Sequence, residues 1–153
     1  MSVRYWISSA TAAAVTAAFD ALETTLATGV GKIERVHLWQ LTDLGDAQEE
    51  VLRVEFVRGN TTSGSGGQTT VLVPTNSFDS AATMAGEVMN TTVASAGTPV
   101  SLAPQGWNIR IPLDYPIPPP QEIAIRTTSR IVLRVSAPAD SITANASWLI
   151  HQE

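Results

Sequence analysis

The stretch Arg130–Glu153, RIVLRVSAPADSITANASWLIHQE, decides the class of fold. Ile131, Leu133 and Val135 alternate with their neighbours, and after an Ala-Pro-Ala-Asp-Ser segment the apolar residues of Ile142–Ile150 alternate with polar ones. Alternation with a period of two places one set of side chains on each face of a β-strand. The stretch therefore predicts two strands joined by a turn, a terminal β-hairpin.

The same alternation recurs upstream and predicts further strands. The strand at 33–41 has apolar residues on both faces, with Ile33, Trp39 and Leu41 on one and Val36 and Leu38 on the other. Such a strand is usually covered on both sides, by the rest of the fold or by a partner. The other strands that the pattern predicts are 1–7, 52–57, 70–73, 107–113 (at a sheet edge because of its proline) and 122–126.

Two segments have helical features. Apolar residues between Val15 and Leu26 follow helical spacing, but Thr24 and Thr25 favour a strand, and we expect a strand at 19–27. The segment Ser77–Met89 is rich in alanine and methionine and offers Ser77 or Asp79 as an N-cap, which predicts a short helix.

These elements predict an all-β fold, a single-domain β-sandwich over residues 1–153 with at most one or two short helices. About eight short strands, separated by turns, are typical of a sandwich or jelly roll. Residues 1–18 fit either a first strand or an N-terminal arm.

Composition excludes several classes of function. The chain has a net charge of −5 and a pI of about 4.9, which argues against a nucleic-acid partner. It has no cysteine, which removes thiolate catalysis and disulfides. No apolar run reaches the roughly 18–20 residues of a membrane span.

Few residues have the spacing that catalysis or metal binding requires. His37 and His151 have no second histidine at metal-ligand spacing, and no Gly-x-Ser-x-Gly elbow is present. The adjacent carboxylates Glu49 and Glu50 point to opposite faces if they lie on a strand. Asp43 and Asp46 are not expected to bind calcium, because the sequence Asp-Leu-Gly-Asp is chiefly typical of a turn. We predict no enzyme activity, no catalytic residue, no metal and no cofactor.

The loop 59–67 and the tryptophans are the other candidates for function. The loop superficially resembles a phosphate-binding loop but lacks the lysine, so we expect a flexible surface tip. Trp107 and Trp148 are in register with apolar rows and are predicted to be core residues. Trp6 is expected to make contacts with a partner, since it opposes Tyr5 and Ile7 in a short terminal segment.

Four stretches give the chain a resemblance to a known class. They are Arg4-Tyr5-Trp6 before a Ser/Thr/Ala-rich run, Lys32–Trp39 followed by Leu52–Gly59 and a Thr/Ser/Gly tip, the Pro/Asp/Ala linker Pro74–Ala82, and the ending Val132–Ser141. The layout resembles the small head-associated proteins of tailed bacteriophages, the jelly-roll capsid decoration or cement proteins. The chain departs from that layout at Thr11–Ala18 and at the proline-rich connector Tyr115–Pro120.

The resemblance implies a structural virion protein, made in the host cytoplasm, that binds the major capsid protein on the capsid surface. It also implies a homotrimer, which the doubly apolar strand at 33–41 independently favours. No nucleic acid and no membrane is expected as a partner. The alternative is a carbohydrate- or receptor-binding β-sandwich of a tail or a cell surface. The residues expected at an oligomer or capsid interface are Arg4, Tyr5, Trp6, Trp39, Tyr115 and Ile117.

Overall fold

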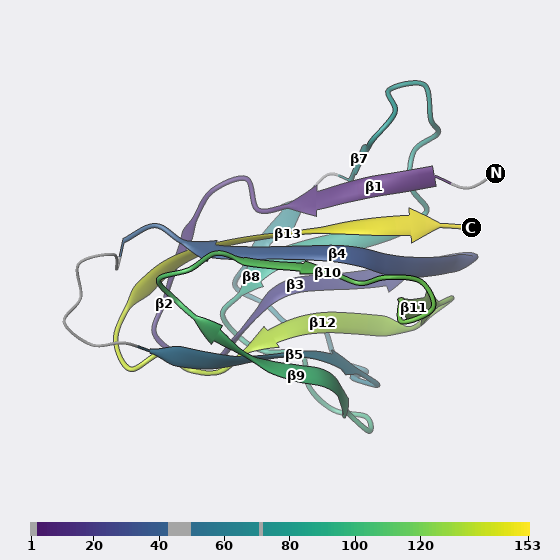
Figure 1. The fold of residues 1–153 in the computed structure, drawn as a ribbon. Helices are drawn as coiled ribbons and strands as arrows, with labels where there is room; N and C mark the ends of the chain where they lie inside the picture. The colour runs from purple at the N-terminus through teal and green to yellow at the C-terminus, as the bar shows by residue number, and fades with distance from the viewer. Residues whose placement is uncertain (1–2, 43–49, 71) are drawn as a thin grey trace.

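Two antiparallel sheets packed face to face form the protein (Figure 1). The computed structural model describes residues 3–42, 50–70 and 72–153, and no helix occurs among them. Sheet A contains β1 (Val3–Ser8), β2 (Ala13–Val15), β4 (Val30–Gln40), β7 (Val73–Pro74), β10 (Leu113–Pro116), β11 (Ile123–Arg126) and β13 (Ile142–Gln152). Sheet B contains β3 (Phe19–Leu26), β5 (Val51–Arg58), β6 (Gln68–Thr70), β8 (Met84–Asn90), β9 (Val100–Asn108) and β12 (Arg130–Val135).

The strand order identifies a jelly roll. Sheet A runs β10-β4-β13-β1-β7, with β11 also paired to β4 and β2 to β13, and sheet B runs β6-β8-β3-β12-β5-β9. Four antiparallel pairs, β1 with β13, β3 with β12, β4 with β10 and β5 with β9, lie alternately in the two sheets. This is the arrangement of an eight-strand ribbon wound into two Greek keys. The segment with β6, β7 and β8 is an insertion between β5 and β9.

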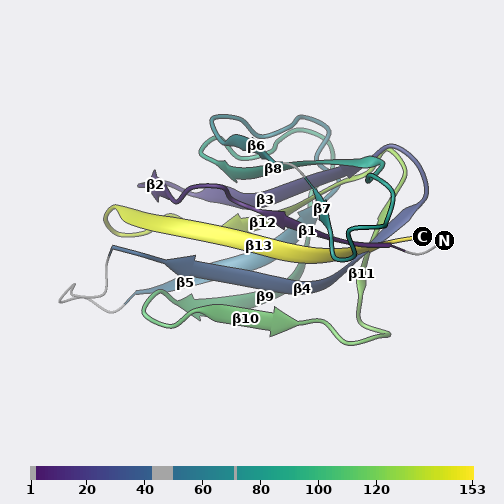
Figure 2. The same cartoon turned by 90° about the horizontal axis from the view of Figure 1, so that it is seen from above.

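The core lies between the inner faces of the sheets. Figure 2 looks down on β13 and β4 of sheet A, which lie over the strands of sheet B. Trp107 and Trp148 are fully buried there, which confirms their prediction as core residues. They pack in one continuous cluster with aromatic and aliphatic residues from both sheets. The other large, fully buried side chains are Tyr5, Phe19, Phe56, Ile7, Leu22, Ile33, Leu38, Met89, Ile109 and Ile125.

The two strands of the C-terminal stretch are confirmed, but the hairpin is wrong. β12 pairs with β3 and β5 in sheet B, whereas β13 pairs with β1 and β4 in sheet A. The connection between them crosses from one sheet to the other. Alternation predicts which face of a strand is buried, but it does not identify the neighbouring strand.

A β-bulge explains why β4 is not apolar on both faces. Leu149 of β13 is paired with Arg35, and the next residue, Ile150, is paired with Ile33, so Glu34 is an extra residue. The bulge returns Val36 and Leu38 to the core-facing row that contains Ile33. The prediction that this strand is apolar on both faces is therefore wrong. The strand gives no argument for a trimer.

The predicted helix at Ser77–Met89 is also wrong. Its second half forms β8, in which Met84 and Val88 face the core and pair across to Leu26 and Leu22 of β3. Burial on the sheet decides this segment in place of the helix propensity of alanine and methionine.

The predicted strand at 107–113 consists of the end of β9, a turn and the start of β10. The Asn108 side chain accepts the N–H of Arg110, and its carbonyl accepts the N–H of Ile111. Pro112, from which an edge position was predicted, lies between the two strands, and β9 and β10 each lie at the edge of their sheet.

The strands predicted near the N-terminus and at 70–73 compare with the structure as follows. Residues 3–8 form β1 between β13 and β7, so they are a strand and not an arm. The segment 19–27 is a strand, as predicted. The predicted strand 70–73 contains residue 71, outside the described residues, and its ends belong to β6 in sheet B and β7 in sheet A.

Deletion of Glu34 tests the bulge. In the shortened β4, side chains would alternate regularly between the two faces, and Ile33, Val36 and Leu38 would still face the core. The deletion removes the hydrogen bond from the Ile117 N–H to the Glu34 carbonyl. We expect a folded protein destabilised by about 1–2 kcal/mol in urea denaturation.

The matched control is deletion of His37, which would turn Leu38 out of the core and is expected to abolish folding. Equal behaviour of the two deletions would contradict the assigned register.

Candidate interaction surface

The outer face of sheet A is the candidate surface. Residues that alternate with the core row project from it on three neighbouring strands, β1, β13 and β4. We call it the A face, defined by Arg4, Trp6, Arg35, His37, Trp39, Asn145, Leu149 and His151.

An aromatic diagonal crosses the A face. The rings of Trp6 on β1 and His37 on β4 lie 5.5 Å apart, with an angle of 37° between their planes, and they span the intervening β13. Trp39 lies two residues further along the same face of β4. Trp6, His37 and Trp39 are all partly exposed, so the face offers large apolar area with polar edges.

Ion pairs connect the charged residues of the A face to neighbouring carboxylates. Arg4 contacts Glu34 at 2.7 Å, and Arg35 contacts Asp114 at 2.6 Å. His37 lies 3.1 Å from Asp114, and the hydrogen bond from Arg35 is the main cause that lowers the pKa of the Asp114 carboxyl. Exposed pairs of this kind contribute little to folding, but they fix the orientation of guanidinium groups.

The structure places some of the predicted interface residues together and separates others. Arg4, Trp6 and Trp39 lie on the A face. Tyr5 is only 2% exposed, because it alternates with Arg4 and Trp6 and faces the core, where its hydroxyl donates to the Ser80 carbonyl at 2.8 Å.

Tyr115 and Ile117 lie elsewhere. Tyr115 is partly buried and packs against the core, and Ile117 is 4% exposed. Tyr5 and Ile117 therefore have little surface to offer a partner on the A face.

The chain itself covers part of the outer face of sheet B. The loops 59–67 and 91–97 fold across it and pair with each other at Thr62–Ser95 and Ser65–Thr92. Ala94 of the second loop forms a small apolar cluster with Val57 and Val132 of the sheet. The segment expected to be a free tip is therefore a packed cover, and we call the two loops together the B cover.

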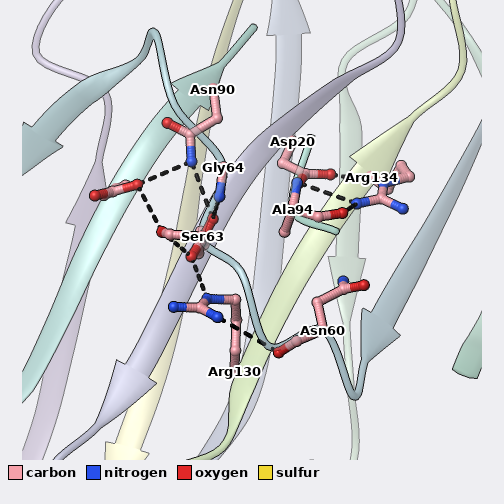
Figure 3. Close-up of polar contacts among 10 residues, drawn as sticks. Asp20, Asn60, Ser63, Gly64, Asn90, Ala94, Arg130 and Arg134 are labelled. Carbon is pink, nitrogen blue, oxygen red and sulfur yellow. Dashed lines mark hydrogen bonds and ion pairs between the residues drawn. The ribbon is translucent and has the colours of Figure 1, made fainter. Parts of the chain in front are cut away.

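Buried carboxylates attach the B cover to sheet B (Figure 3). Glu23 of β3 accepts hydrogen bonds from the Ser63 hydroxyl at 2.6 Å, the Gly64 N–H at 3.0 Å and the Asn90 amide at 3.0 Å. It is also ion-paired with Arg130 of β12. The backbone N–H of this glycine-rich loop thus binds a carboxylate of the protein itself, not a phosphate.

Asp20 makes the equivalent attachment for the other loop. It is fully buried, accepts the Ala94 N–H at 2.6 Å and receives two hydrogen bonds from Arg134. Arg134 in turn donates to the Ala94 carbonyl at 2.7 Å. Burial raises the pKa of Asp20, and the hydrogen bonds from Arg134 and Ala94 oppose that effect.

This network is built for structure. Ser63 donates its hydroxyl to a carboxylate that is already paired with a guanidinium, so Glu23 is poorly suited to act as a base toward it. Sequence reasoning missed Asp20 and Glu23. Part of the signal was available, because two acids in the expected strand 19–27 and two arginines on β12 could form ion pairs. Their spacings differ, since the acids are three residues apart and the arginines four, and only the bulge between β3 and β12 brings each acid to its arginine.

The other residues weighed for chemistry are dispersed. Glu50 is buried, and one of its oxygens accepts the Ala139 N–H at 2.7 Å. Asp43, Asp46 and Glu49 lie outside the described residues. Among residues 3–42, 50–70 and 72–153, no three His, Asp or Glu side chains are grouped as a metal site would require. In the same ranges no helix is long and apolar enough to span a membrane.

Comparison with protein families, with curated proteins and with solved structures found no match for this chain. The assignment of function therefore depends on the fold and its surfaces.

Substitution of Asp20 by asparagine tests the attachment of the B cover. It would leave Arg134, whose side chain is 21% exposed, without its counter-charge. We expect a loss of about 3 kcal/mol in urea denaturation. The double variant Asp20→Asn with Arg134→Gln should lose at least about 1 kcal/mol less than the sum of the single losses.

The matched control is the exposed pair Arg35–Asp114, where Asp114→Asn should cost no more than about 1 kcal/mol. Equal losses at the buried and the exposed pair would contradict the structural role of Asp20.

Proposed function

We propose that the chain is a structural, non-enzymatic virion protein that binds the outer surface of a tailed-phage capsid as a decoration or cement protein. The resemblance of sequence layout motivates this class, and the jelly-roll topology is consistent with it. The partner is the major capsid protein, and the A face makes the contact.

The observation that carries the proposal is the difference between the two outer faces. The B cover buries Val57 and Val132 on sheet B, while the A face leaves Trp6, Trp39 and Arg4 accessible. Tryptophan and arginine are enriched among the residues that dominate binding energy at protein interfaces. Side chains that are already held in place, such as Arg4 by Glu34, lose little freedom on binding a broad protein surface.

The proposed homotrimer follows from the resemblance alone. Three linked copies would engage a capsid lattice together, so a modest affinity of each A face would give a tight overall attachment. The contact would add interface area between capsid subunits and so oppose expansion from the packaged genome.

A carbohydrate- or receptor-binding module is the second candidate. Two tryptophans on one sheet face, Trp6 and Trp39, could stack on sugar rings. The ion pairs around them favour the protein partner, because guanidinium groups fixed by carboxylates suit flat protein contacts.

The experiment measures binding of purified chain to capsids assembled without it, and the heat and osmotic resistance of the resulting particles. Trp6→Ala with Trp39→Ala should weaken binding by about 100-fold or more and remove the gain in resistance. The control is Val51→Ala, an exposed apolar residue on β5 of sheet B, which should bind as the unchanged chain does.

Particles that resist heat and osmotic shock equally well with and without the chain would overturn the cement role. A glycan array positive at low micromolar affinity, with loss on Trp6→Ala, would favour the sugar-binding candidate instead.

A further inference from the structure

A cleft lies at the open edge of the sandwich, where β9 of sheet B faces β10 and β11 of sheet A. It consists of two adjoining hollows, of about 640 and 360 Å³, that share Arg58 and Ala124. The smaller hollow is lined by the apolar side chains of Leu102, Tyr115, Ile117 and Ile123, with Gln121 and Glu122 as its polar residues besides Arg58. The cleft thus gives Tyr115 and Ile117, which the A face does not include, a common location.

The larger hollow is cationic. Arg58, Arg126 and Arg130 line it, together with the hydroxyls of Thr128 and Ser129. Arg130 is neutralised by Glu23, but in the described part of the chain no ion pair engages the guanidinium of Arg58 or of Arg126. Such a cleft has room for a large apolar side chain next to a carboxylate.

The chain displays a segment with that chemistry at the opposite edge of sheet A. Phe78 is 95% exposed, the highest exposed fraction among the large hydrophobic residues that the structure describes. Asp79 follows it, and its carboxylate forms no ion pair among the described residues. Figure 1 shows the loop between β7 and β8 projecting from the sandwich.

This loop is held in a defined shape. The Thr75 N–H donates to the Arg4 carbonyl at 2.9 Å, and the Ser80 carbonyl accepts the Tyr5 hydroxyl. Within the loop, the side-chain oxygen of Asn76 accepts a hydrogen bond from the Phe78 N–H, and the Asn76 carbonyl accepts one from the Asp79 N–H. An ordered turn presents an apolar anchor with a smaller entropic cost than a free chain.

We infer that Phe78–Asp79 of one copy docks into the cleft of a second copy, with Phe78 in the apolar hollow and Asp79 beside Arg58 and Arg126. β7 and the cleft strands β10 and β11 lie at opposite edges of sheet A, so one copy cannot fill its own cleft. The contact is head-to-tail, and repetition of such a contact closes into a ring when its rotation permits. In the proposed trimer this would be the contact between copies. Only that role in the trimer rests on the proposed function.

Sedimentation velocity over a micromolar concentration series tests the contact. The unchanged chain should associate. Phe78→Ala should weaken association by about tenfold or more, and so should Ala124→Trp, which fills the shared wall of the cleft at an exposed position. Ile111→Ala is the matched control, because Ile111 is also exposed and lies outside both hollows.

Mixing gives the decisive arm of the experiment. The Phe78→Ala chain keeps an intact cleft and the Ala124→Trp chain keeps an intact Phe78, so the mixture should form a one-to-one dimer that neither variant forms alone. Asp79→Arg and Arg58→Glu should each weaken association, and their combination in one chain should restore it.

A monomeric unchanged chain, unaltered association of Phe78→Ala, or absence of the mixed dimer would each overturn the inference. These outcomes are separate from the proposed function, because a monomer that still strengthens capsids through Trp6 and Trp39 would overturn the inference alone. Association through Phe78 without any binding to capsids would overturn the function alone.

Discussion

Two buried carboxylates on one strand determine how the surfaces of this protein are used. Asp20 and Glu23 lie on the outer row of β3, where a charge without partners would strongly destabilise the fold. Arg134 and Arg130 on the neighbouring strand neutralise them, and backbone N–H groups of the B cover complete their hydrogen bonding. The need to satisfy these groups draws the loops 59–67 and 91–97 onto sheet B.

That requirement gives the two sheets different outer faces. On sheet B the loops bury Val57 and Val132, while Val51 at the other end of β5 is exposed. On sheet A the bulge at Glu34 keeps the aliphatic residues of β4 inside, while Arg35, His37 and Trp39 remain outside and partly exposed. The accessible tryptophans follow from this strand geometry, and they form the basis of the proposed capsid contact.

The sequence predicts the fold class because alternation is a local property. The two strands within 130–153 and the burial of Trp107 and Trp148 could be recognised from period-two patterns, and the strand at 19–27 from the β-propensity of its threonines. Features that depend on distant partners could not. The bulge at Glu34 is visible only in register with β13, and the crossing between β12 and β13 depends on which sheet each strand joins. The segment Ser77–Met89 has helix-forming residues whose preference is overridden by pairing of β8 with β3.

The candidate surface was predictable in part for the same reason. Arg4 and Trp6 alternate with core residues and could be placed outside, and the same alternation puts Tyr5 inside. Trp39 could not be placed by alternation, because the bulge at Glu34 separates it from the face of Ile33. The Phe78 loop and the cleft were not predictable, because the cleft combines residues from five separate strands and Phe78 lies within a segment that suggested a helix.

Hydroxyl-radical footprinting of the chain, free and bound to capsids, tests the central claim most directly. In the free chain Trp6 and Trp39 should be oxidised while Trp107 and Trp148 are spared, because only the first pair reaches solvent. On capsids, Trp6 and Trp39 should become protected, with no change at the exposed Val51 of sheet B. Protection that falls on the B cover while Trp6 and Trp39 remain reactive would contradict the assignment of the A face as the binding surface.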